Sequence, residues 1–262
     1  MMENPGAREL LLRLLLVADG GQLPAWEAVK GCALFGISEN NARVALTRLV
    51  TAGLVEAAGR GVYRLGPRGR VLGQQVRAWR HAEQHARAWS GQWVAVHAAA
   101  LGRTDRPALR VRQRALALAG LRELEPGLFV RPDNMAGGVE VLRERLYALG
   151  LSRQAAVFQA AQFGEEREAR ARRLWNVALL ERGYASGLQK LERSLARLPR
   201  LAPDSAAREA YLLGDEGIHQ LVFDPMLPQP LVDVELRRAY AEMVKRYDEA
   251  GHQAWRRFMD AR

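Results

Sequence analysis

The chain has one cysteine, very few lysines and no long apolar run, and each shortage excludes a class of protein. Cys32 is alone among 262 residues, which excludes a disulfide within the chain and a cysteine-rich zinc site. It fits a reducing cytosol. The apolar run from Leu10 to Val17 is interrupted by Arg13, so it is too short to span a bilayer and lacks a signal-peptide pattern. The sequence therefore predicts a soluble cytoplasmic protein with no membrane partner.

The motifs of common enzyme classes are also missing. The sequence has no G-x-S-x-G elbow, no P-loop, no G-x-G-x-x-G after a strand and no H-E-x-x-H. His81 and His85 have the four-residue spacing of a helical metal pair, but no third ligand follows. Asp224 precedes Pro225, and that pairing is accounted for by a turn. We expect no enzyme activity, no metal site and no cofactor.

Charge is unevenly distributed. The net charge is +10, and 36 of the 39 basic residues are arginine, a bias that GC-rich coding partly explains. Residues 38–80 carry eight arginines and two acids, a local charge of +6, whereas residues 201–262 carry eight basic and eleven acidic groups, a local charge of −3. The first segment therefore predicts a basic surface suited to phosphates.

That basic segment opens with a helix whose two faces differ. Ser38 is an N-cap residue and Gly53 a stop signal, so we expect a helix between them. The apolar positions recur at helical spacing: Ala42, Ala45, Leu46 and Leu49. Polar residues lie outside this stripe, as in a helix that enters a major groove. Because Asn pairs with adenine and Arg with guanine, we expect DNA contacts from Ser38, Asn40, Asn41, Arg43, Thr47 and Arg48. The alternative is that the asparagines only start the helix and the arginines pair with acids of the protein.

A short hairpin follows this helix. Strands are expected from Leu54 and from Val62 to Leu65, joined by a turn at Gly59-Arg60-Gly61. Arg60 projects from the turn, where it could contact phosphate or the minor groove, and Arg64 lies on the returning strand. Two earlier helices, about 7–17 and from Pro24 to Phe35, complete a winged helix-turn-helix.

The remaining chain predicts three more parts. Residues 70–90 predict a connector helix with Trp79 and Trp89 on its apolar side. Strands and helices then alternate over 91–164, which favours a small ferredoxin-like fold. The expected elements are strands at Trp93–His97, Leu128–Val130 and Ala156–Phe158, and helices at Pro107–Ala119 and Val139–Leu149.

From Glu165 onward the pattern is helical. Breaks are expected at Gly183, Leu198-Pro199 and the turn from Asp224 to Pro230, with a last helix from about Val232 to Phe258. In the earlier segment, the helix expected at Pro107–Ala119 should expose three arginines to solvent: Arg110, Arg112 and Arg114. The predicted fold class is α+β multidomain: a winged helix-turn-helix domain (1–69), a connector helix (70–90), a ferredoxin-like α+β domain (91–164) and an all-helical C-terminal domain (165–262).

The order of these parts resembles the PaaX-type transcriptional repressors of phenylacetate degradation. Four stretches carry the resemblance: Asn41–Leu54 with the wing Gly59–Leu65, Arg112–Leu121 with Pro126–Pro132, Leu174-Trp175 with Leu180 and Tyr184, and Phe223–Pro228. Each is moderately specific, and together they span almost the whole chain. Two stretches depart from the family, Ile218-His219-Gln220 and Leu231–Leu236, and both lie in the helical C-terminal region.

The resemblance implies a homodimeric repressor that binds double-stranded operator DNA and is released by an aryl-CoA or acyl-CoA thioester. Such an effector needs basic groups for its phosphates and an apolar slot for the acyl group. The candidate residues are Arg131, Arg172, Arg173 and Trp175, near Arg167 and Arg170. A solvated helix face is the alternative interpretation of this arginine cluster.

Two other functions stay open. One is a nucleic-acid-binding protein that senses no ligand, although the few aromatic residues offer no stacking platform for single strands. The other is an enzyme with a nuclease-like ferredoxin domain, although no acidic pair lies in the predicted strands. The sequence specifies neither the operator nor the acyl group.

Overall fold

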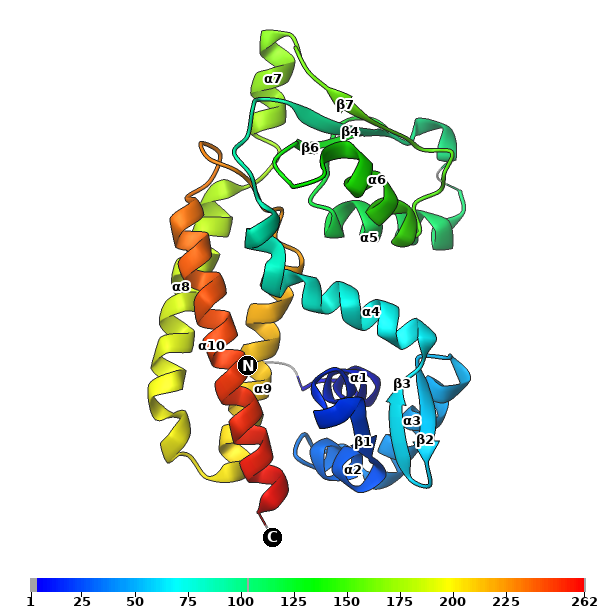
Figure 1. Cartoon of the computed structure of the whole chain (residues 1–262), viewed down its shortest axis with the longest axis vertical. Helices are drawn as coiled ribbons and strands as arrows, with labels where there is room; N and C mark the ends of the chain where they lie inside the picture. Colours follow the sequence, from blue (N-terminus) through cyan, green and yellow to red (C-terminus); the bar gives the residue numbers. More distant parts are fainter. Residues whose placement is uncertain (1–3, 103, 262) are drawn as a thin grey trace. The chain divides into compact units, whose positions relative to one another are not determined.

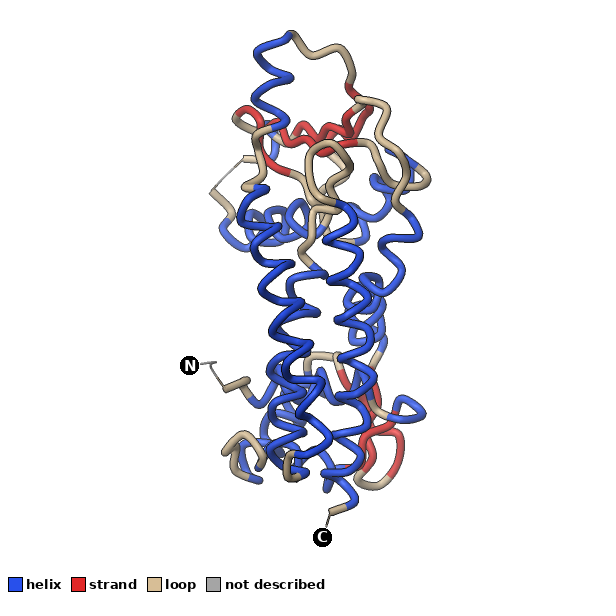
Figure 2. Tube along the Cα trace, turned by 90° about the vertical axis from the view of Figure 1, so that its left-hand side faces the viewer, coloured by secondary structure: helices blue, strands red, loops and turns tan. Residues whose placement is uncertain are grey.

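The computed structural model describes residues 4–102 and 104–261 and is a mixed α/β structure. Within these residues it has ten α-helices and two small sheets (Figures 1 and 2). The helices are α1 Ala7–Val17, α2 Ala25–Ala33, α3 Glu39–Thr51, α4 Pro67–Arg77, α5 Arg106–Leu118, α6 Gly138–Ala148, α7 Glu165–Arg172, α8 Val177–Arg197, α9 Pro203–Val222 and α10 Val234–Asp260. The strands are β1 Gln22–Pro24, β2 Val55–Gly59, β3 Val62–Leu65, β4 Trp93–His97, β5 Arg122–Glu125, β6 Leu128–Pro132 and β7 Ala156–Ala160.

The chain divides into two compact units. Unit 1 comprises residues 1–79, 190–217 and 243–262, and unit 2 comprises residues 80–189 and 218–242. Helices α8, α9 and α10 each contribute residues to both units. The helical C-terminal region expected from the sequence is therefore confirmed, although its helices are shared between the units.

Unit 1 begins with three helices around an apolar core. Leu10 and Leu11 of α1 are fully buried, and Leu46 and Leu49 of α3 are almost so. Cys32 of α2 lies in the same core, where burial raises the pKa of its thiol to about 11. A thiol with a raised pKa is a small apolar filler rather than a nucleophile.

A three-stranded antiparallel sheet with the order β1-β3-β2 lies in the same unit (Figure 1). The hairpin β2–β3 was expected, and its register pairs Glu56 with Arg64 across the strands. Strand β1 was not expected, because it is only three residues long and ends in proline. It adds a third strand to the hairpin through the pairing of Leu23 with Tyr63.

Unit 2 contains a four-stranded antiparallel sheet with the order β5-β6-β4-β7. Along the chain its elements run β4, α5, β5, β6, α6, β7. Strand β5 was missed at the sequence level because three of its four residues are charged. Val94 and Val96 of β4 and Leu146 of α6 share the core of this unit.

Three expectations about local structure are wrong. Arg112 is buried rather than solvated, since its guanidinium donates to the carbonyl oxygen of Gly102 (2.9 Å). Gly183 does not interrupt a helix, because α8 runs through it with a close neighbour, Gln220. The segment 70–90 is not one α-helix: α4 ends at Arg77, and a 3₁₀ helix follows as far as His85.

Among the described residues, no helix is both long enough and apolar enough to cross a membrane.

Candidate nucleic-acid interface

Helix α3 begins as the sequence predicts. The Oγ of Ser38 accepts a hydrogen bond from the backbone N–H of Asn41 (3.3 Å), which caps the first turn. Ala42, Leu46 and Leu49 then attach one face of the helix to the core. The amphipathic pattern therefore fixes which face of α3 is turned to solvent.

The exposed face of α3 carries the residues predicted to contact DNA. The structure leaves Ser38, Asn40, Asn41, Arg43, Thr47 and Arg48 all exposed. Besides Ser38, whose hydroxyl caps the helix, two of them have partners within the helix. Arg43 donates from Nε (2.8 Å) and Nη2 (2.6 Å) to Oε1 of Glu39, and Thr47 donates its hydroxyl to the carbonyl oxygen of Arg43 (3.1 Å).

Arg48 and Arg60 differ from Arg43. Neither makes an ion pair with another residue that the structure describes. Arg60 lies in the turn between β2 and β3, beside Gly61, whose φ of 70° suits glycine. These two guanidinium groups can engage an external anion without breaking a contact inside the protein.

An arginine–glutamate cluster joins the hairpin to α4. Nε of Arg64 lies 2.7 Å from Oε1 of Glu56, and Nη1 of Arg70 lies 3.4 Å from the same oxygen. The hydrogen bond from Arg64 lowers the pKa of Glu56 below its usual range. Two cations share one carboxylate, so the cluster keeps a net positive charge.

In unit 1, the C-terminal helices contact α1, α2 and the residue that follows α2. Arg13 of α1 pairs with Asp215 of α9. Nζ of Lys30 in α2 donates to the carbonyl oxygen of Met259 (3.0 Å), and Arg208 donates to that of Leu34 (3.0 Å). None of these three contacts involves the exposed face of α3.

Arg131, a candidate effector residue, is buried and forms hydrogen bonds within the protein. It is 3% exposed and donates to the carbonyl oxygen of Ala119 (2.7 Å) and to Oδ1 of Asn134 (3.1 Å). Burial, together with repulsion from Arg145, lowers its pKa to about 10. Its hydrogen bonds hold the end of β6 to the end of α5.

The other effector candidates lie around an aromatic cluster in unit 2. Trp175 stacks on Trp93 with ring centroids 6.4 Å apart, and its buried Nε1 has no hydrogen-bond partner among the described residues. Nε of Arg172 donates to Oε1 of Glu168 (2.8 Å), and the guanidinium carbon lies 4.9 Å from the ring centroid of Trp89. Arg173 follows the last residue of α7 and is exposed. Arg172 is therefore engaged, and Arg173 is the more accessible cation.

The nearby arginines of α7 are engaged as well. Nε of Arg167 lies 2.9 Å from Oε1 of Glu125, and Nη2 of Arg170 donates to the carbonyl oxygen of Leu124 (2.9 Å). These contacts attach the helix to β5. They favour a structural role for both side chains.

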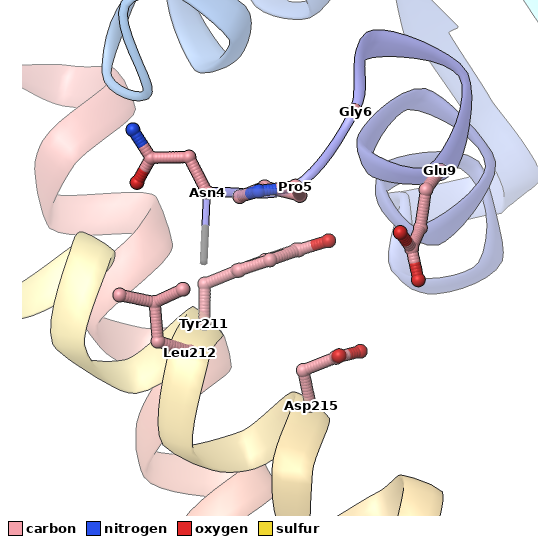
Figure 3. A pocket seen from close by; sticks show the side chains of 7 residues that line it. All are labelled: Asn4, Pro5, Gly6, Glu9, Tyr211, Leu212 and Asp215. Carbon is pink, nitrogen blue, oxygen red and sulfur yellow. The ribbon is translucent and has the colours of Figure 1, made fainter. Parts of the chain in front are cut away.

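A pocket of about 310 Å³ lies in unit 1 between the start of α1 and α9 (Figure 3). Its lining includes the carboxylates of Glu9 and Asp215 and the ring of Tyr211. Arg13 already pairs with both carboxylates, and the lining residues include no basic side chain for the phosphates of a CoA thioester. The pocket therefore does not match the expected effector.

His81 and His85 lie on the 3₁₀ helix. Throughout the described part of the chain, His, Cys, Asp and Glu form no group of three that could hold a metal ion.

The sequence interpretation overlooked Val44. This side chain is 41% exposed on α3, among the residues predicted to contact DNA. Its position outside the stripe of Ala42, Ala45, Leu46 and Leu49 was the signal that could have identified it.

Comparisons with known proteins agree with this architecture. The model of the PaaX-like protein family matches residues 7–69, and that of the PaaX-like protein C-terminal domain matches residues 175–257. No curated protein matches the chain. Among solved structures, the uncharacterized protein Rv0674 from Mycobacterium tuberculosis is similar, with 24% sequence identity, a TM-score of 0.56, and coverage of 95% of this chain and 98% of that one. At that identity the likeness concerns the fold alone. Because both family models match the chain, it belongs to the PaaX-like family.

Proposed function

We propose that this protein is a transcriptional regulator that binds operator DNA through α3 and the β2–β3 hairpin. One observation carries the proposal: a capped helix buries one face in its own core and leaves Asn, Thr and Arg side chains exposed on the other, beside a basic hairpin. A surface helix that only contacts water has no requirement for Asn, Thr and Arg side chains beside a basic hairpin. Membership of a family of regulators supports the same conclusion.

In this proposal unit 1 holds a winged helix-turn-helix domain, with α3 as the recognition helix and β2–β3 as the wing. Helix α3 lies in a major groove, where Asn41 and Arg48 hydrogen-bond base edges. Arg60 binds a phosphate or the adjacent minor groove, and Arg64 does so once DNA draws it from Glu56. Arg43, held by Glu39, is a weaker candidate unless DNA releases it.

The element order and strand order of the sheet in unit 2 support a ferredoxin-like fold. The proposed division of the chain remains a DNA-binding domain (1–69), a connector (70–90), a ferredoxin-like domain (91–164) and a helical C-terminal domain (165–262). We place the protein in the cytoplasm, where it would meet both DNA and a CoA thioester.

We further propose that it acts as a homodimeric repressor of an aromatic-acid catabolic operon, such as one for phenylacetate, and is released by an aryl-CoA or acyl-CoA. Family membership supports this step. Of the candidate residues, Arg173 is free to meet a phosphate, and Trp175 has a spare N–H donor. Arg131 would have to give up buried hydrogen bonds first.

The test is DNA binding by fluorescence anisotropy, using a duplex selected from a random library. Arg60→Ala should weaken binding to all sequences and reduce the salt slope by about one unit, because one phosphate contact is lost. Arg48→Ala should cost about 1–3 kcal/mol on the selected site and less on random DNA if it contacts a base. Arg114→Ala is the matched control, because it removes the same charge from an exposed position on α5.

Equal effects of all three variants would contradict the assignment of α3 and the hairpin as the DNA surface. The effector is tested in the same assay by adding phenylacetyl-CoA, with free CoA as control. Release by the thioester alone supports sensing. Unchanged binding favours a nucleic-acid-binding protein that senses no ligand.

A further inference from the structure

The reading face of α3 has an apolar centre. Val44 is 41% exposed, whereas Ala45 and Leu46 beside it in the chain are 8% and 2% exposed. Residues three or four apart on a helix are neighbours on its surface. Val44 is therefore next to Asn40 and Asn41 on one side and Thr47 and Arg48 on the other.

Thr47 extends this apolar centre. Its hydroxyl donates to the carbonyl oxygen of Arg43 (3.1 Å), so its hydrogen is not available to a base. The methyl group of Thr47 remains as its other contact surface, one helical turn from Val44. Two aliphatic groups thus lie side by side between polar side chains that suit bases and phosphates.

An exposed valine at this place has a chemical counterpart in DNA. Among the edges of the four base pairs in the major groove, only the C5 methyl group of thymine is apolar. Arg48 supplies the adjacent positive charge, so the patch is complementary to a groove lined by phosphates. These features favour DNA as the occupant over a second protein.

We propose that Val44, assisted by the methyl group of Thr47, reads a thymine through its C5 methyl group. This inference rests on the proposed DNA-binding function and adds a specificity determinant to it. The contact reads sequence without a hydrogen bond. It therefore selects thymine over cytosine at one position of each half-site.

The test uses the full-length protein and the selected duplex with each thymine replaced in turn by deoxyuridine, which lacks only the methyl group. For the wild type, one position in each half-site should lose affinity about fourfold, the effect of one buried methyl group. In Val44→Ala the same replacement should change affinity less than about 1.5-fold. Thr47→Ser, which keeps the hydroxyl, should give an intermediate loss.

Val50→Ala is the matched control. Val50 is similarly exposed (39%) on the same helix. It lies six residues after Val44, so its side chain points about 120° away from that of Val44 around the helix axis. This variant should keep the fourfold penalty for deoxyuridine. Circular dichroism of each variant checks that the helix is intact.

The outcomes separate this inference from the proposed function. Sequence-specific binding that is insensitive to deoxyuridine at every thymine overturns the methyl contact and leaves the regulator intact. A penalty that persists in Val44→Ala assigns the effect to DNA shape and also overturns the inference. Failure to select any site overturns both.

Discussion

Removing one hydroxyl group, in Tyr184→Phe, tests the role of a buried carboxylate in unit 2. Tyr184 is 1% exposed and Asp224 is 7% exposed. The tyrosine hydroxyl donates to Oδ2 of the aspartate (2.5 Å), while Oδ1 accepts from the backbone N–H of Met226 (2.7 Å). The pair holds the turn that follows α9. Phenylalanine keeps the ring packing and removes only the donor.

The expected cost is about 2 kcal/mol in the free energy of unfolding, the range for a hydrogen bond to a charged group. No cavity term is added, because the ring itself is unchanged. The loss leaves one oxygen of Asp224 buried without its donor. Urea titration followed by tryptophan fluorescence measures the change for the unit that contains the pair.

The cost should depend on pH. Burial raises the pKa of Asp224 above its usual value, and the hydrogen bond from Tyr184 opposes that rise. A carboxyl whose pKa is raised by folding destabilises the folded state as pH rises through that pKa. Without Tyr184 the pKa rises further. The variant should therefore lose more stability at pH values above the pKa of Asp224, where its carboxyl is ionised, than at pH values below it.

Tyr211→Phe is the control. The hydroxyl of Tyr211 is also buried, but it has no hydrogen-bond partner among the described residues. Its removal should not lower the stability, because no hydrogen bond is lost and a buried hydroxyl without a partner is unfavourable in the folded state. Equal losses for the two variants, or a loss at Tyr184 that is independent of pH, would refute the reasoning.

Three further changes test other contacts. Gly69→Ala should destabilise unit 1 by at least about 2 kcal/mol, since a Cβ there would lie 2.0 Å from the carbonyl oxygen of Leu54; a thermal melt measures this. Arg64→Ala should return the pKa of Glu56 toward its ordinary value, as followed by an NMR pH titration of its carboxyl carbon. Arg131→Met should cost about 2–4 kcal/mol, because buried acceptors lose their donor, and a normal urea midpoint would contradict the structural role of this guanidinium.

Helix α3 was predictable because its signals are local. Ser38 caps the start of the helix, and Gly53 has a positive φ just after the helix ends. The apolar residues at helical spacing face the core. The partner of Arg43 could also have been read from sequence, since Glu39 stands four residues earlier. The pairing of Arg64 with Glu56 required the hairpin register, which the turn at residues 59–61 nearly fixes.

The features that the sequence did not reveal depend on distant parts of the chain. Arg112 looks solvated by helical periodicity, but the carbonyl oxygen of Gly102 draws its guanidinium inward. Strand β5 has a charged sequence and exists because β6 offers a hydrogen-bonding edge. Arg131 had the chemistry of a ligand-binding residue, yet Ala119 and Asn134 already use its donors. Local patterns cannot report such long-range acceptors.

The close fit of α4 against α1 and β3 bears on how a fragment that contains α3 and the β2–β3 hairpin should be cut. Gly73 lies so near Leu16 that a Cβ would come within 2.5 Å of it, and Arg77 and Arg70 donate to the carbonyl oxygens of Leu16 and Leu65. A truncation at residue 69 would strip this cover and open apolar surface to water. An expression fragment that extends through Arg77 keeps it, so the excisable module is longer than residues 1–69.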